Sequence, residues 1–311
     1  MSGDTIEAPG SAEISVLIAR ASTEDHDRIL ETLAALREQD CAFAYEVIVV
    51  DRLGDEITRR IDTQPGTVRL LRCPSDATLP EMRSMALAAA RGRVVAVTED
   101  HCVPCRGWLR AFDAAFRRHP QAVAVGGCVA NGLTSTAFDW ATYLCEYAAF
   151  APPVAEGPQA SLPGMNIAYL KSVLTSVPAA ALTRGFWETT VHPSLLRAGH
   201  VFVSTGDALV HHRKRFSPRF FLAQRSAYSR YYAGIRFAPR RWHLRLAAAL
   251  LCPLLPFLLA ARFAAVARHN DQVAARALRA LPWLALFYAA WAAGECAGYL
   301  AGPGQALRAI E

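Results

Sequence analysis

The sequence has few charged residues and no dense cysteine pattern, and both features limit its class. Charged residues make up 19% of the 311 residues, against 53% hydrophobic ones, and the mean hydropathy is +0.16. Such a chain is apolar for a soluble protein, so we expect part of its surface to face lipid or a protein partner. The eight cysteines are scattered, which excludes a secreted disulfide scaffold and favours a reducing, cytosolic environment.

Signals that would indicate other classes are also missing. Residues 1–13 contain acidic residues and no apolar h-region, so they do not resemble a signal or transit peptide, and we expect a short disordered lead-in. The chain has no recognisable zinc finger, RNA-recognition signature or basic heptad helix, so we do not expect its net charge of +6 to serve nucleic acid. Cys102 and Cys105 form a CxxC, but no second pair exists to close a tetrahedral zinc site.

Apolar, β-branched runs alternate with stretches of helical spacing over the first two thirds of the chain. This alternation predicts parallel strands with right-handed crossovers, whose ligand site lies at the carboxyl ends of the strands. Regularity fades between Asn131 and Pro163, where we expect an acceptor region or a mobile loop. The predicted strands are ISVLIA (14–19), YEVIVVD (45–51), VRLLRC (68–73), RVVAVTED (93–100) and AVAVGG (122–127).

Acidic side chains stand where two of these strands end. Asp51 ends the second strand, where it could accept hydrogen bonds from a base or ribose, or could equally be a helix N-cap or turn residue. Glu99, Asp100 and His101 end an apolar strand, a costly place for two carboxylates unless a metal or cation neutralises them. This pattern predicts a metal-diphosphate site, with a solvated turn as the alternative. His212 follows another apolar run and is a further possible imidazole ligand, although surface histidines are the commoner outcome.

The last part of the chain is apolar, and the segment that precedes it is rich in basic residues. Two uncharged segments, 246–261 and 280–294, fall just short of the length that spans a bilayer. Ten Lys or Arg residues lie between Arg213 and Arg245, which suits anionic lipid and predicts a cytosolic position for the preceding domain. We expect a membrane-associated helical hairpin at 241–311, either spanning or re-entrant, after a domain at 14–240 that holds all the site residues; a hairpin packed on that domain is the alternative.

Five segments together resemble the inverting family 2 glycosyltransferases of the GT-A fold. Any one of these segments would be weak alone, but five in order at sensible spacing make a fairly specific signal. The resemblance covers roughly residues 14–235 and implies a Rossmann-like nucleotide-sugar domain, a UDP- or GDP-type donor and a Mn²⁺ or Mg²⁺ ion. The segments are ISVLIA, YEVIVVD, LPEMRSMALAAARGRVVAVTEDHC, PGMNIAYLKSVL and FWETTVHPSLLRAGH.

The resemblance assigns donor and metal roles by position. It implies that Asp51 binds the nucleoside and that Arg83 faces the donor. Glu99, Asp100 and His101 align with the family's acidic metal-binding triplet, in which His101 replaces the usual last aspartate. Histidine can ligate manganese, so an altered metal requirement is expected. The expected donor contacts are Asp51, Arg83, Glu99, Asp100, Gly164, Asn166 and Arg213, and the expected metal ligands are Asp100, His101 and His212.

The expected catalytic base lies in the segment FWETT. Glu188 aligns with the first acid of the family's Glu-Asp pair, and the second position, usually the base, is Thr189. Glu188 is therefore the candidate base, with His192 as an alternative. The chain also departs after its first strand, where Arg20 begins the stretch that replaces the family's usual Pro and Asn.

The resemblance implies transfer of a sugar to a hydroxyl acceptor, and the apolar tail favours a lipid or lipid-linked acceptor over a free glycan. The departures from the family pattern motivate a second hypothesis, a non-catalytic nucleotide-sugar-fold protein that scaffolds a membrane assembly. A small transporter is a poor third, because two marginal apolar segments cannot build a pathway without extensive oligomerisation. The expected location is the cytoplasmic membrane, with the catalytic domain facing the cytosol.

Overall fold

The computed structural model describes residues 12–63 and 68–310, so most of the lead-in expected at residues 1–13 lies outside the described residues. The strands form a mixed sheet in the order β3-β2-β1-β4-β8-β6-β9-β5, with β7 paired to β9. This α/β sheet confirms the predicted fold class. The strands are β1 (Ile14–Arg20), β2 (Tyr45–Asp51), β3 (Val68–Arg72), β4 (Val94–Glu99), β5 (Cys102–Pro104), β6 (Ala122–Asn131), β7 (Gly157–Pro158), β8 (Ile167–Leu170) and β9 (Val201–His212).

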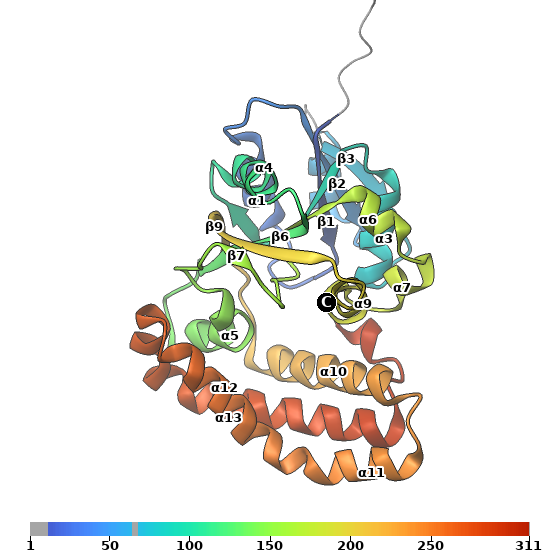
Figure 1. Ribbon diagram of the computed structural model, residues 1–311, viewed down its shortest axis with the longest axis vertical. Coiled ribbons are helices and arrows are strands. Elements are labelled where there is room, and N and C mark those ends of the chain that lie inside the picture. Colours follow the sequence, from blue (N-terminus) through green and yellow to red (C-terminus); the bar gives the residue numbers. More distant parts are fainter. Residues whose placement is uncertain (1–11, 64–67, 311) are drawn as a thin grey trace, which may run out of the picture.

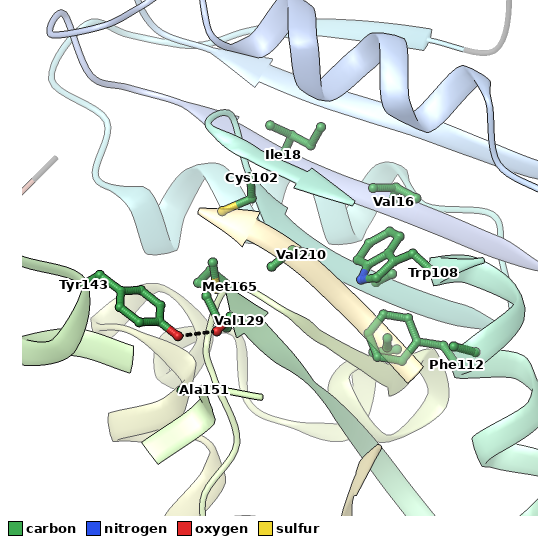
Figure 2. Close-up of a cluster of buried hydrophobic side chains, with 14 of the residues drawn as sticks. Val16, Ile18, Cys102, Trp108, Phe112, Val129, Tyr143, Ala151, Met165 and Val210 are labelled. Atoms are coloured by element: carbon green, nitrogen blue, oxygen red, sulfur yellow. Dashed lines mark hydrogen bonds between the residues drawn. The ribbon is translucent and has the colours of Figure 1, made fainter. Parts of the chain in front are cut away.

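The first half of the sheet follows the predicted alternation. β1 pairs in parallel with β2 and β4, and β2 pairs in parallel with β3. Alternate residues of β1 point to opposite faces: Val16 and Ile18 join a core cluster with α1, α2 and α4 (Figure 2), whereas Leu17 joins a second cluster with α3. Both faces are therefore covered, as parallel strands require. These helices are α1 (Ile29–Arg37), α2 (Glu56–Asp62), α3 (Leu79–Ala89) and α4 (Trp108–Arg118).

The segment between Asn131 and Pro163 is more regular than predicted. It contains α5 (Ala137–Tyr147) and a short 3-10 helix, η1 (Ala148–Phe150). A capping box starts α5: the Thr136 hydroxyl accepts from the backbone N–H of Asp139, whose carboxylate accepts from the backbone N–H of Thr136. The expectation of an irregular stretch was therefore wrong for this helix, and the Thr-x-x-Asp spacing is the signal that could have predicted it.

The second half of the sheet mixes strand directions. β8 runs antiparallel to both β4 and β6, while β9 runs parallel to β6 and antiparallel to β5. The pairing of β5 with β9 sets Cys102 opposite His212 and so brings the end of β9 next to the end of β4. The short helices between β8 and β9 are α6 (Lys171–Ser176), α7 (Ala179–Arg184), α8 (Trp187–Thr190) and α9 (His192–Arg197).

The C-terminal helices form layers beneath the sheet domain (Figure 1). α10 lies next to the domain, α13 packs along α10, and α11 and α12 pack on α13. Gly294 allows the close approach of α13 to α10, since a Cβ there would lie 2.0 Å from Ser229 Oγ. By length and composition, Trp242–Ala267 and Asp271–Ala301 could each cross a membrane. The elements are α10 (Pro218–Phe237), α11 (Trp242–Leu251), η2 (Cys252–Leu254), α12 (Leu255–Ala267), α13 (Asp271–Ala301) and η3 (Ala306–Ala309).

Candidate active site

A cavity of about 380 Å³ lies at the carboxyl ends of β1 and β4. The end of α5, the loop that precedes β8, the start of α8, the end of β9 and one face of α10 complete its wall, and α13 contributes Trp291. This is the edge of the sheet where a ligand site was expected. Its acidic and basic lining residues are Arg83, Glu99, Asp100, His101, Glu146, Glu188, His212, Lys214 and Arg225.

The end of β4 holds a histidine between two carboxylates. His101 Nδ1 lies 2.7 Å from Asp100 Oδ1, and His101 Nε2 lies 3.2 Å from Glu99 Oε2. Burial alone would lower the pKa of His101, but the hydrogen bonds to Asp100 and Glu99 outweigh it and raise the pKa to about 9. Burial would likewise raise the pKa of Glu99, yet its hydrogen bond to His101 lowers it to about 2. Near neutral pH, His101 is therefore the cation that neutralises this acidic strand end.

The same strand end offers a possible metal site. Glu99, His101 and Cys102 each present a ligand atom, and these atoms lie within 4.8 Å of one another. His212 stands at the same place, with its ring 4.8 Å from that of His101. Burial, followed by the charge of Glu99, raises the pKa of the Cys102 thiol well above its ordinary value, so this thiol stays protonated. The carboxylates and imidazoles are thus the ligands to consider.

Glu188 extends into the cavity at the start of α8. Its Oε2 lies 3.6 Å from Arg83 Nη1, and Tyr228 donates a hydrogen bond of 3.3 Å to its Oε1. Oε2 is buried and has no hydrogen-bond partner among the residues that the structure describes. Gly164 leaves room for this carboxylate, because a Cβ at that position would lie 2.6 Å from it. Arg83 also lies 3.5 Å from Glu99, and so joins Glu188 to the end of β4.

Asp51 stands at the same edge of the sheet but does not line the cavity. Its Oδ1 accepts a hydrogen bond of 2.8 Å from Arg20, and its Oδ2 accepts from Thr58 Oγ1 at 2.8 Å and from the backbone N–H of Gly54 at 3.0 Å. Arg20 is fully buried and also pairs with Asp55 at 2.7 Å. Both oxygens of Asp51 are therefore engaged inside the protein, and its nucleoside-binding role stays a prediction.

Three other predicted site residues lie outside the cavity. Asn166 is fully buried, where it accepts from Trp108 Nε1 at 2.7 Å and donates to two backbone carbonyls, so the structure gives it a place in the core. His192 is buried against Tyr169, whose hydroxyl lies 2.6 Å from His192 Nε2, and burial lowers its pKa to about 4. Arg213 points to Glu31 at 2.6 Å, and the next residue, Lys214, lines the cavity instead.

Several cavity residues were missed or given little weight in the sequence. Glu146 at the end of α5 forms an ion pair with Arg225 of α10, and both side chains are largely buried. Burial raises the pKa of Glu146, whereas the Arg225 charge opposes that rise. Lone charged residues on two helices give no sequence signal of such pairing. Trp291 and Ile310 also line the cavity, so its wall includes residues that follow the predicted domain boundary at residue 240.

Residues 21–173 match the family described as Glycosyl transferase family 2. The chain therefore carries a family 2 glycosyltransferase domain, and its mixed sheet is of the GT-A type. Among solved structures, GalNAc-T7 with UDP, GalNAc and Mn²⁺ is similar at a TM-score of 0.51 and 14% identity over 67% of this chain and 44% of that one. Residues 1–349 of S. aureus TarS give a TM-score of 0.45 and 16% identity over 68% and 63% of the two chains.

The chain thus spans less than two thirds of either of these two solved structures. No curated protein matches its sequence.

Proposed function

We propose that the protein transfers a sugar, with inversion, from a UDP- or GDP-type donor to a hydroxyl acceptor. The observation that carries this proposal is the Oε2 of Glu188, which accepts no hydrogen bond from the described residues, lies near Arg83 and is buried in a charged cavity at the carboxyl ends of β1 and β4. A carboxylate oxygen in that state can accept the proton of an incoming hydroxyl group. The family 2 domain over residues 21–173 supports the same chemistry.

In the proposed reaction, Glu188 takes the proton of the acceptor hydroxyl while the acceptor oxygen attacks the anomeric carbon of the donor. The bond from that carbon to the diphosphate oxygen breaks, and the nucleoside diphosphate leaves with the electron pair. Cationic side chains in the cavity stabilise this leaving group electrostatically. Arg83, Lys214 and Arg225 supply that charge, and Gly164 keeps the backbone close to the reacting groups.

The donor set at the end of β4 fits a divalent cation. Glu99 and Asp100 offer the carboxylate oxygens that Mg²⁺ and Mn²⁺ prefer, and His212 offers an imidazole nitrogen that Mn²⁺ accepts. His101 would offer a second one only after it loses its proton. Such an ion would neutralise charge on the leaving diphosphate. His101 already neutralises the two carboxylates, which supports a weaker dependence on metal than three acids would produce.

A second cavity supports a lipid or lipid-linked acceptor. It measures about 280 Å³, shares Phe150, Leu162 and Pro163 with the first cavity, and reaches Val266 and Asn270 near the turn between α12 and α13. Half of its lining residues are Ala, Pro or Val, and Phe150 and Leu162 add apolar surface, which suits an apolar chain. Together with the basic residues before α11, this supports a protein at the cytoplasmic membrane whose catalytic domain faces the cytosol.

Turnover of donors by the purified full-length protein tests the proposal. UDP- and GDP-sugars are incubated with the protein, with Mn²⁺, Mg²⁺ or a chelator, and release of nucleoside diphosphate is measured with and without a lipid extract as acceptor. Release that depends on the protein supports a transferase. Tight binding of a nucleotide sugar without any release would favour the scaffold hypothesis instead, which the replacement of the usual aspartates by His101 and Thr189 motivates.

A further inference from the structure

Helix α13 is held by the catalytic domain at both ends and in its middle. At its start, Asn270 Nδ2 donates a hydrogen bond of 3.1 Å to the carbonyl of Ala151. In its middle, Trp291 lines the first cavity, and the chain just past its end returns to the sheet domain, where Arg308 lies 3.5 Å from Asp76. A helix of 31 residues is about 46 Å long, longer than the hydrocarbon core of a bilayer. If α13 crossed a bilayer, one of its ends would lie far from the domain that contacts both.

The preceding apolar segment, α11 to α12, returns along α13. Near its start, Arg245 Nε donates a hydrogen bond of 2.7 Å to the carbonyl of Tyr299, close to the end of α13. Its last residues lead into Asn270, which is bonded to the catalytic domain. Figure 1 shows the same arrangement, with α10, α13 and α11 stacked as layers below the sheet domain. The turn between the two apolar segments therefore lies on the side of the catalytic domain.

The outermost layer presents an exposed apolar face, and exposed arginines precede it, follow it and lie on α13. Leu250 is 72% exposed and Phe257 is 73% exposed, values unusual for side chains of this size in water. Residues 240–279, which contain this face, have seven arginines and one acidic residue, so this part of the chain carries a net positive charge. The exposed apolar residues include Trp242, Leu250, Leu251, Leu254, Phe257 and Leu258. The exposed arginines include Arg240, Arg241, Arg262, Arg268, Arg276 and Arg279.

We infer that α11, α12 and α13 lie in the plane of an anionic membrane surface and that neither apolar segment crosses the bilayer. The apolar stripe enters the boundary between headgroups and acyl chains, while the arginines contact lipid phosphates. This inference rests on the membrane location given under the proposed function and adds its geometry. A lipid surface fits better than a protein partner, because the apolar residues extend over two successive helices and the charged residues of this segment are arginines with the single exception of Asp271.

The sidedness of the turn between α12 and α13 tests this geometry. Full-length protein is added to the outside of sealed vesicles containing equal parts of phosphatidylcholine and phosphatidylglycerol, and bound protein is recovered by flotation. A membrane-impermeant maleimide then labels the His269→Cys variant, and adducts are counted by mass relative to the parent chain with its native cysteines. The Glu56→Cys variant, on the exposed surface of α2, is the matched control. We expect both variants to gain an adduct to the same extent.

A measurement of depth complements the measurement of sidedness. In the Phe257→Trp variant, lipids brominated near the headgroup should quench the added tryptophan fluorescence more than lipids brominated at the end of the acyl chain, because the helix lies shallow. Protection of His269→Cys with strongest quenching from the deep bromines would show a spanning hairpin and overturn the in-plane geometry while keeping the membrane location. Failure of the parent protein to float with any vesicle would overturn the membrane location itself, and donor turnover would still test the catalytic proposal separately.

Discussion

The carboxyl ends of β2 and β4 lie at the same edge of the sheet, both carry acidic residues, and they have different surroundings. At the end of β2, every oxygen of Asp51 is bound by Arg20, Thr58 or a backbone N–H. At the end of β4, Glu99 lines an open cavity, where it contacts His101 and Arg83. A carboxylate with a complete set of internal partners stabilises the fold, whereas one facing a cavity can exchange partners with a ligand.

This difference shows why a carboxylate at a strand end is not sufficient to indicate a ligand site. The register alone places Asp51 and Glu99 together, because Arg20 pairs with Asp51 and Ala19 pairs with Glu99. What separates their roles is the buried guanidinium of Arg20, which occupies the space beside Asp51. Variants of the residues that face the cavity should therefore lower activity, whereas variants at the end of β2 should lower the stability of the fold.

The largest effect is expected for Glu188→Gln, which removes the proposed base and keeps its shape. Transfer should fall by about 10² to 10⁴-fold, the usual contribution of a general base. Binding of the nucleotide-sugar donor, measured by calorimetry, should change little, since the amide still accepts from Tyr228. The exposed Glu56→Gln variant serves as control. Full activity of Glu188→Gln would assign the base to another residue.

The next effect is expected at the end of β2, for Arg20→Leu. This change leaves Asp51 buried without its cation, and the free energy of unfolding should fall by about 3 to 5 kcal/mol. Asp51→Leu in the same chain should recover part of that loss, because the double variant contains no unpaired charge at this position. Urea unfolding of the three variants checks this. Equal stability of Arg20→Leu and the parent would show that the ion pair is not a structural element.

A third prediction concerns pH and the buried His192. Its folded-state pKa is lowered to about 4 from an ordinary value of 6.5, so the unfolded chain binds more protons between these values. Stability should therefore be complete above pH 6.5 and fall as the pH drops towards 4, by about 3 kcal/mol from this residue. The His192→Gln variant should lose less stability over this range, as judged from urea unfolding at each pH. The exposed His243→Gln variant should follow the parent; an unchanged pH dependence in His192→Gln would contradict the assignment.

The smallest effect is expected for His101→Asp, which restores a triplet of acids at the end of β4. Replacing a cation by an anion changes the charge beside the ion by two units, so Mn²⁺ binding should tighten by at least about tenfold. The activity of the variant should then respond more steeply to added Mn²⁺ and to a chelator than that of the parent, which titration of the ion against donor turnover measures. An identical response in the two proteins would show that His101 does not replace a metal ligand.

The sequence predicted the repeating part of the fold and the acidic end of β4, and it predicted less where contacts join distant elements. Hydrophobic runs of four to seven residues with helices between them predict parallel strands, and β1 to β4 follow that pattern. Gly164 and Glu188 were found because they lie in motifs. The ion pair between Glu146 and Arg225 was not predicted, because its two residues lie on helices that are far apart in the sequence.

The predicted donor residue Asn166 lies in a motif but has partners inside the core. A short polar residue after a glycine is typical of a loop that contacts a diphosphate, but three strong hydrogen bonds inside the core use its whole side chain. The buried position of Asn166 depends on Trp108 and on two backbone carbonyls that are distant in sequence, so the residues around Asn166 in the sequence do not predict it.

The position of Trp291 in the wall of the cavity couples the two proposed binding events, that of a donor in the cavity and that of α13 to a bilayer. Its helix belongs to the apolar layer, and its indole lines the cavity and donates a hydrogen bond of 2.7 Å to Glu295 within the same helix. A ligand that orders this wall and a bilayer that orders α13 thus act on one element, and thermodynamic linkage makes their influence reciprocal. If binding to vesicles changes the affinity for the donor by some factor, binding of the donor must change the affinity for vesicles by the same factor.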